Sequence, residues 1–172
     1  MKVLVVIDMQ NDFISGSLGS KEAQAIVPAV EKRLEESKDA LVIFTRDTHT
    51  KYYPHTQEGK YLPVEHCIKG TSGWEIVEPL KPYSKNATIT DKPAFGSLEL
   101  PKIIRKLSGA DLQEIELCGV CTDICVVSNA LILKAAFPET KISVRAELCA
   151  GATPQGHEAA LEVMRTCQVE VR

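Results

Sequence analysis

The stretch LQEIELCGVCTDICVVSNALILKAAF, residues 112–137, changes from one apolar pattern to another within a few residues. Residues 112–120 form a mostly apolar run ending in Gly-Val, which predicts a buried strand. Over 122–137 the apolar residues follow helical spacing, with Thr122 as the expected N-cap and Asp123 in the first turn. The stretch therefore predicts a strand, a short turn and a helix, the unit from which parallel α/β sheets are built.

Three cysteines lie within this unit, at Cys118, Cys121 and Cys125. They fit a catalytic nucleophile, a redox or zinc-binding C-x-x-C, or three packing residues, and the segment alone leaves these interpretations open. Cys118 lies inside the predicted strand, which is poor geometry for a redox pair with Cys121. Cys125 falls in the first helical turn, where a helix N-terminus lowers the pKa of a thiol and favours the reactive thiolate.

The alternation of strands and helices continues on both sides of this unit. Strands that are apolar on both faces, separated by amphipathic helices, are typical of a parallel sheet covered on both sides. We therefore predict an α/β fold: a three-layer, doubly wound, mostly parallel sheet of about six strands with helices on both faces. The predicted strands are 2–8, 40–47, 86–91, 112–120, 140–146 and 167–172, and the predicted helices are 22–38, 98–109, 122–137 and 153–165.

Length and composition describe an ordinary globular chain. We expect residues 1–172 to form one domain, in which the long segment of about 48–85 has little periodicity and is interpreted as a functional loop. A formal net charge of −3 gives no electrostatic reason for binding nucleic acid or an anionic membrane. No apolar run is long enough for a signal peptide or a membrane span, so a cytoplasmic location is expected.

Polar side chains stand at the carboxyl ends of the predicted strands, the edge at which open α/β sheets bind ligands. Asp8, at the end of the first strand, could orient or deprotonate a nucleophile, with Asp12 as the competing carboxylate. Lys92, just after the 86–91 strand, could lower the pKa of a neighbouring thiol. Taken singly, Asp8 fits a helix cap or a surface turn equally well, and Lys92 fits a surface lysine.

The second strand ends in TRDTHT, in which one residue separates Asp47 from His49. Alternate residues of an extended segment point the same way, so both side chains can face one ion. His66 could supply a third ligand from the long segment, with Glu58 or His55 as the fourth. One carboxylate with two or three imidazoles suits zinc, iron or manganese, although each residue alone also fits a surface hydrogen-bonding group.

Five segments carry a family resemblance. They are VLVVIDMQNDF (3–13), FTRDTH (44–49), HCIKGTSGWEI (66–76), KPAFGS (92–97) and LCGVCTDICVVSNA (117–130). In this order, and across nearly the whole chain, they resemble the isochorismatase-like cysteine hydrolases, and within them the nicotinamidase/pyrazinamidase branch. The first and last segments, similar to the opening strand and the nucleophile segment of that family, are the most specific.

The resemblance implies a catalytic triad of Asp8, Lys92 and Cys125. Cys125 would be the nucleophile, Asp8 the base that takes its proton and later returns it, and Lys92 the group that holds both in place. The resemblance also implies a cis peptide between Val120 and Cys121. The backbone N–H groups of Cys121 and Cys125 would then form the oxyanion hole, so the sulfur of Cys121 need not react.

The resemblance further implies a divalent metal, zinc first and iron or manganese as alternatives. Its ligands would be Asp47, His49 and His66, with Glu58 as a fourth in the manner of some nicotinamidases. The ion would take the pyridine nitrogen of nicotinamide and leave the carboxamide facing the nucleophile.

Phe13 would line the ring pocket. The opposite wall is less defined, because YLPVEH (61–66) departs from the family pattern, with Tyr61 or Leu62 where an aromatic residue is common. The implied reaction is hydrolysis of nicotinamide to nicotinate and ammonia through a cysteine thioester, in a homo-oligomer. The nearest alternative is another small-amide or carbamoyl hydrolase of the family without a catalytic metal. A non-catalytic binding domain is a more remote one.

Overall fold

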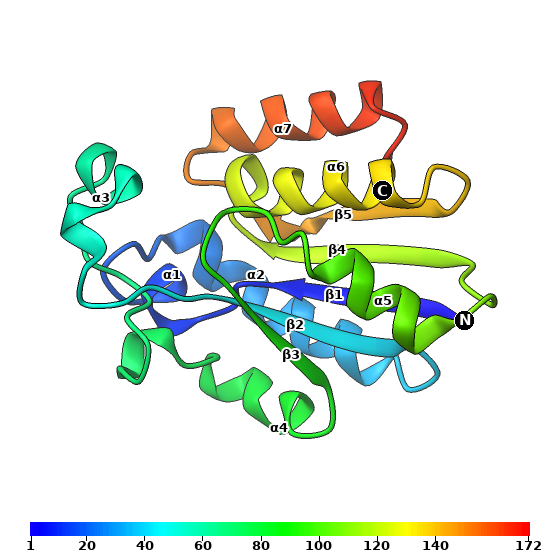
Figure 1. The fold of residues 1–172 in the computed structure, drawn as a ribbon, viewed down its shortest axis with the longest axis horizontal. Helices are drawn as coiled ribbons and strands as arrows, with labels where there is room; N and C mark the ends of the chain where they lie inside the picture. The colour runs from blue at the N-terminus through cyan, green and yellow to red at the C-terminus, as the bar shows by residue number, and fades with distance from the viewer.

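The computed structural model describes residues 1–172 and contains one six-stranded sheet (Figure 1). The strands are β1 (Lys2–Ile7), β2 (Leu41–Asp47), β3 (Thr88–Lys92), β4 (Glu114–Val120), β5 (Lys141–Ala150) and β6 (Glu170–Val171). Their order is β3-β2-β1-β4-β5-β6, and every neighbouring pair is parallel. The helices are α1 (Asn11–Ile14), α2 (Lys21–Glu35), α3 (Gln57–Tyr61), α4 (Lys81–Ser84), α5 (Leu100–Ser108), α6 (Val127–Ala136) and α7 (Pro154–Thr166).

Helices cover both faces of the sheet. In Figure 1, α2 lies behind the strands, α5 and α6 lie in front of them, and α7 packs beside α6. The strand order reverses direction between β1 and β4, which makes the carboxyl ends of these two strands the switch point where α/β sheets bind ligands. The predicted three-layer α/β fold is confirmed, with a sheet that is parallel throughout. No helix of this fold has both the length and the apolar character needed to cross a membrane.

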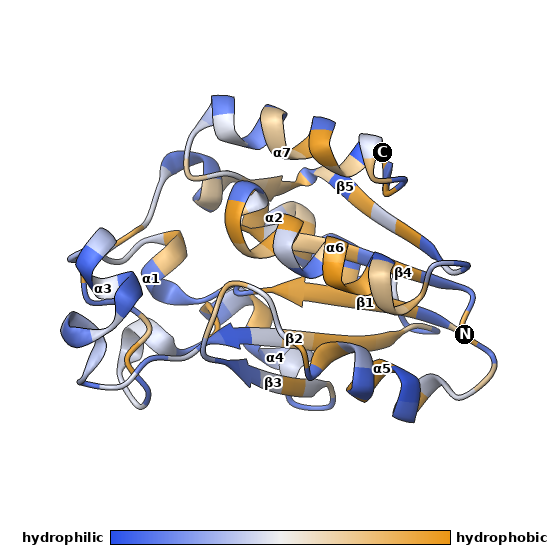
Figure 2. Cartoon of the chain, turned by 45° about the horizontal axis from the view of Figure 1, so that its top comes forward, coloured by the Kyte–Doolittle hydropathy of each residue, from blue (hydrophilic) through white to orange (hydrophobic).

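The core is built around β1, whose residues from Val3 to Ile7 are all buried. Figure 2 shows that this strand is hydrophobic along its length, as expected for a central strand covered on both faces. The long segment 48–85 contains the short helices α3 and α4; its part with α3 lies beyond the carboxyl ends of the strands, whereas α4 lies beside β3 and leads into its amino end (Figure 1). The part with α3 places the predicted functional loop next to the switch point.

The last two strands differ from their predicted bounds. β5 continues to Ala150, because its pairing with β4 resumes at Cys149 after an irregularity that contains the polar residues Arg145 and Glu147. β6 is reduced to two residues, since Gln168, at φ +64°, still belongs to the turn after α7. Edge pairing with β5 then begins only at Glu170.

Gly119 is the only glycine within the six strands, and we expect it to tolerate substitution poorly. Its φ is +117°, and a Cβ there would lie 2.1 Å from the carbonyl oxygen of Ile7 on β1. We therefore expect Gly119→Ala to lower the free energy of unfolding by about 3 kcal/mol or more. Gly70→Ala is the matched control, because Gly70 has φ +86° but open space around its Cα, so it should lose only about 1 kcal/mol. Equal losses of unfolding free energy for Gly119→Ala and Gly70→Ala in denaturant titrations would contradict the close approach of Gly119 to Ile7.

Candidate active site and metal centre

Asp8, Lys92 and Cys125 meet at the switch point, although they come from three different strand ends. The Nζ atom of Lys92 lies 2.6 Å from Oδ2 of Asp8 and donates to the Sγ atom of Cys125 at 3.4 Å. All three side chains are buried. The structure thus brings together the carboxylate, the ammonium and the thiol that the sequence placed at separate strand ends.

Burial dominates the electrostatics of Cys125 and Asp8, whereas at Lys92 burial is outweighed by the charge of Asp8 and its other negative neighbours, which raise the pKa of Lys92. Burial raises the pKa of the Cys125 thiol well above its ordinary value, the charge of Asp8 raises it further, and Lys92 offsets only part of this. The expectation of a lowered thiol pKa is therefore wrong, because desolvation of the buried thiol and the charge of Asp8 outweigh the charge of Lys92. Burial also raises the pKa of Asp8, despite the opposing charge of Lys92. A carboxylate with a raised pKa is a better acceptor for the thiol proton.

The turn that carries Cys125 begins one residue earlier than expected. Cys121 is the N-cap and makes no side-chain capping bond, Thr122–Val126 form a π-helical turn, and the Thr122 hydroxyl contacts His157 instead. The prediction of Thr122 as N-cap is therefore wrong. The peptide between Val120 and Cys121 is cis, and the backbone N–H of Cys121 donates to no acceptor in the protein. That N–H is free for a ligand.

Three supporting side chains of the site were missed from the sequence. Thr45 donates its hydroxyl to Oδ1 of Asp8 at 2.6 Å, and Asn129 donates to the backbone carbonyl of Cys125 at 2.8 Å. The Gln10 side chain donates to the carbonyl of Asp47 at 2.9 Å and accepts its N–H at 2.7 Å. Thr45 alone carried a usable signal, because it lies two residues before Asp47 on the same strand and therefore points to the same face.

Four side chains form a compact cluster beside Lys92. One ligand atom from each of Asp47, His49, Glu58 and His66 lies within 4.8 Å of the other three. The Nε2 atom of His49 is 2.9 Å from Oδ2 of Asp47, and Nε2 of His66 is 3.5 Å from the same oxygen. Two imidazole nitrogens with two carboxylates are a donor set that suits zinc and other first-row divalent ions.

The surroundings of this cluster also fit a metal centre. The Nδ1 atom of His66 lies 2.8 Å from the carbonyl oxygen of Val64, which orients the ring and leaves Nε2 facing the cluster. Burial alone would raise the pKa of Asp47, but hydrogen bonds from His49 and His66 lower it overall, so the carboxylate stays charged. Of the two candidates for the fourth position, the structure brings Glu58 to the cluster, whereas His55 stacks on Tyr52 outside it.

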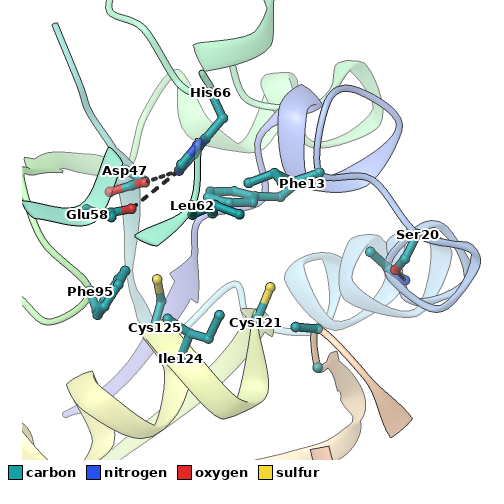
Figure 3. Close-up of a pocket in the computed structure, with 14 residues that line it drawn as sticks. Phe13, Ser20, Asp47, Glu58, Leu62, His66, Phe95, Cys121, Ile124 and Cys125 are labelled. Carbon is teal, nitrogen blue, oxygen red and sulfur yellow. Dashed lines mark hydrogen bonds and ion pairs between the residues drawn. The ribbon is translucent and has the colours of Figure 1, made fainter. Parts of the chain in front are cut away.

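A single cavity of about 290 Å³ joins the thiol and the cluster (Figure 3). Its wall includes Asp47, Glu58 and His66 on one side and Cys121 and Cys125 on the other. Figure 3 shows both sulfur atoms pointing into the space beneath the cluster. A small molecule in this cavity could therefore contact the thiol and the cluster at once.

The apolar walls of the cavity partly differ from expectation. Phe13 and Leu62 line it as predicted, and Phe95, which the sequence did not single out, also does (Figure 3). Tyr61 does not line the cavity and is 84% exposed. Tyr61 ends α3 with its side chain in solvent, so the wall position falls to the next residue, Leu62.

The isochorismatase domain model matches residues 2–172. The chain belongs to the isochorismatase family. Among its relatives, the nicotinamidase/pyrazinamidase of Mycobacterium tuberculosis is 28% identical over 99% of this chain and 98% of its own. The pyrazinamidase of Pyrococcus horikoshii, solved in complex with zinc, superposes with a TM-score of 0.84 at 28% identity, covering 99% of this chain and 98% of that one. The pyrazinamidase/nicotinamidase of Streptococcus mutans superposes with a TM-score of 0.86 at 26% identity over the full length of both chains.

Proposed function

We propose that residues 1–172 form one hydrolase domain that converts nicotinamide and water to nicotinate and ammonia. The observation that carries the proposal is the single cavity in which the Cys125 thiol, paired with Asp8 and Lys92, faces the cluster of Asp47, His49, Glu58 and His66. The names of the relatives from M. tuberculosis, P. horikoshii and S. mutans support this choice of substrate.

Acylation begins with transfer of the thiol proton from Cys125 to Asp8. The sulfur attacks the amide carbonyl carbon, and the carbonyl oxygen takes the negative charge. Asp8 then returns the proton to the amide nitrogen, the C–N bond breaks, and ammonia leaves behind a thioester on Cys125. Lys92, which contacts both groups, holds the carboxylate and the sulfur in line and stabilises the thiolate while it exists.

Deacylation repeats these roles with water as the nucleophile. Asp8 takes a proton from the water molecule as its oxygen attacks the thioester carbon. The C–S bond then breaks, the proton returns to the sulfur of Cys125, and nicotinate is released. In both half-reactions the free N–H of Cys121, with that of Cys125, would donate to the oxyanion.

The cluster would hold a divalent metal through Asp47, His49, Glu58 and His66. When bound, such an ion accepts a lone pair from a heteroaromatic nitrogen and so fixes the orientation of the substrate ring. Phe13 lies beside His66, with ring centroids 5.5 Å apart, and would cover one face of that ring.

Replacing His66 by alanine is expected to weaken zinc binding at least about 100-fold, because it removes one of four converging ligands. Competition titration against a chromogenic chelator measures this without reference to activity. His55→Ala is the matched control, since His55 lies on the same loop but outside the cluster, and its zinc affinity should not change. Equal affinities in both variants would rule out this metal centre.

An amide panel tests the proposed substrate. Zinc-loaded protein should release ammonia from nicotinamide and pyrazinamide, and much more slowly from N-carbamoyl amino acids, which lack a ring nitrogen for the cluster. A preference for the carbamoyl compounds would favour the alternative of a carbamoyl hydrolase. No ammonia from any member of the panel would favour a non-catalytic binding domain.

A further inference from the structure

Thr122, the first residue of the π-helical turn, is tied to α7 rather than to its own turn. Its hydroxyl lies 2.8 Å from Nδ1 of His157, in the first turn of α7. Thr122 is fully buried and His157 is half-buried, so water has limited access to this contact. His157 does not line the cavity that holds Cys125.

A second contact joins the same two segments. Oδ1 of Asp123 accepts the backbone N–H of Ala152 at 2.9 Å, in the connection between β5 and α7. α7 also approaches closely at Gly156, where a Cβ would lie 2.1 Å from Oδ2 of Asp123. The start of α7 is therefore fixed against the turn at two consecutive residues, Thr122 and Asp123.

These contacts act next to the free N–H of Cys121. Thr122 follows Cys121 directly, so the position of Thr122 sets the direction of the peptide units around that N–H. Oxyanion donors act at about 2.7–3.1 Å from the developing charge and lose much of their effect when misaligned. The contact between Thr122 and His157 is therefore well placed to hold the N–H of Cys121 in position for the oxyanion.

We propose that His157 is a positioning residue for hydrolysis, acting through Thr122 to hold the π-helical turn, next to the N–H of Cys121, against α7. This inference rests on the proposed amide hydrolysis. It assigns no proton transfer to His157, because its Nδ1 atom is already engaged by Thr122 and its ring lies outside the cavity. Its effect should appear in the transition state and hardly at all in ground-state binding.

The test compares His157→Ala, Thr122→Val and the double variant with zinc-loaded wild type. Each single change should lower kcat about 10- to 100-fold and change KM less than about threefold. Pyridine-3-carbaldehyde supplies a second readout, because addition of the Cys125 thiol to its carbonyl creates an oxygen that needs the same donors. Its affinity should fall with kcat, while the affinity for nicotinate should stay within about twofold.

Three comparisons separate positioning from a general loss of structure. His157→Asn should recover most of kcat, since its side-chain amide can occupy the place of Nδ1 and can donate or accept. The double variant should lose no more than the worse single variant, as expected for two residues that act through one contact. Glu158→Gln, at the exposed neighbouring position on α7, should behave as wild type.

Wild type without amidase activity would overturn the proposed function itself. Active wild type with unchanged kcat and aldehyde affinity in Thr122→Val would overturn this inference alone. Parallel losses of nicotinate and aldehyde affinity would also overturn it, because they would indicate a collapsed cavity. If His157→Ala does not fold, Thr122→Val and His157→Asn decide the question by the same two readouts.

Discussion

Replacing Cys125 by alanine should lower the release of ammonia from nicotinamide at least about a thousandfold. The change removes the only sulfur that contacts Lys92, since Cys121, the other cysteine that lines the cavity, makes no such contact. The cluster of Asp47, His49, Glu58 and His66 is untouched, so zinc binding and nicotinate affinity should remain. A coupled ammonia assay measures the loss, and calorimetric titration of nicotinate checks that the cavity is intact.

Cys118→Ala is the matched control for this variant. Cys118 lies on β4 and is completely buried in the core, and burial raises the pKa of its thiol well above the ordinary value. Alanine at this position should cost some stability and leave kcat within about twofold. Turnover by Cys125→Ala comparable with that of Cys118→Ala would contradict the assignment of the nucleophile.

Asp8→Asn is expected to lower kcat about 100- to 10,000-fold, because the amide cannot accept the thiol proton. The shape of the side chain is retained, so the contact with Thr45 and the fold at the end of β1 should survive. Since the charge of Asp8 raises the pKa of the Cys125 thiol, alkylation by iodoacetamide at neutral pH should not slow in this variant, which separates the loss of proton transfer from a loss of thiol reactivity.

The control for Asp8→Asn is Asp91→Asn. Asp91 precedes Lys92 on β3 and pairs with Arg46 at the surface, so its loss should change kcat less than about twofold. More than a tenth of wild-type kcat in Asp8→Asn would show that another group takes the proton.

The sequence was sufficient to predict the fold, and to predict that the polar side chains of the site meet at one edge of the sheet. Apolar runs located all six strands, and the carboxyl ends of parallel strands meet at one edge whatever the strand order. Asp8 and Asp47 could therefore be placed together before the strand order was known. The triad and the role of the metal cluster were predicted from the family resemblance, because the periodicity of apolar residues carries no information about chemical roles.

Features that depend on tertiary packing could not be predicted in this way. The raised pKa of Cys125 follows from complete burial, which the local position at a helix start does not reveal. Thr122 has the residue type of an N-cap, yet its hydroxyl is used by His157, distant in sequence. Tyr61 and Leu62 are adjacent, and only the end of α3 decides which of them faces the cavity.

The most direct test of the central claim, a thioester on Cys125, is partitioning with hydroxylamine. Nicotinamide and methyl nicotinate differ only in the leaving group, so both should acylate Cys125 to give the same intermediate. Zinc-loaded protein with either substrate and a fixed concentration of hydroxylamine should then yield nicotinohydroxamate and nicotinate in one common ratio. Different ratios from the two substrates, or no hydroxamate from the amide, would contradict a shared acyl-enzyme.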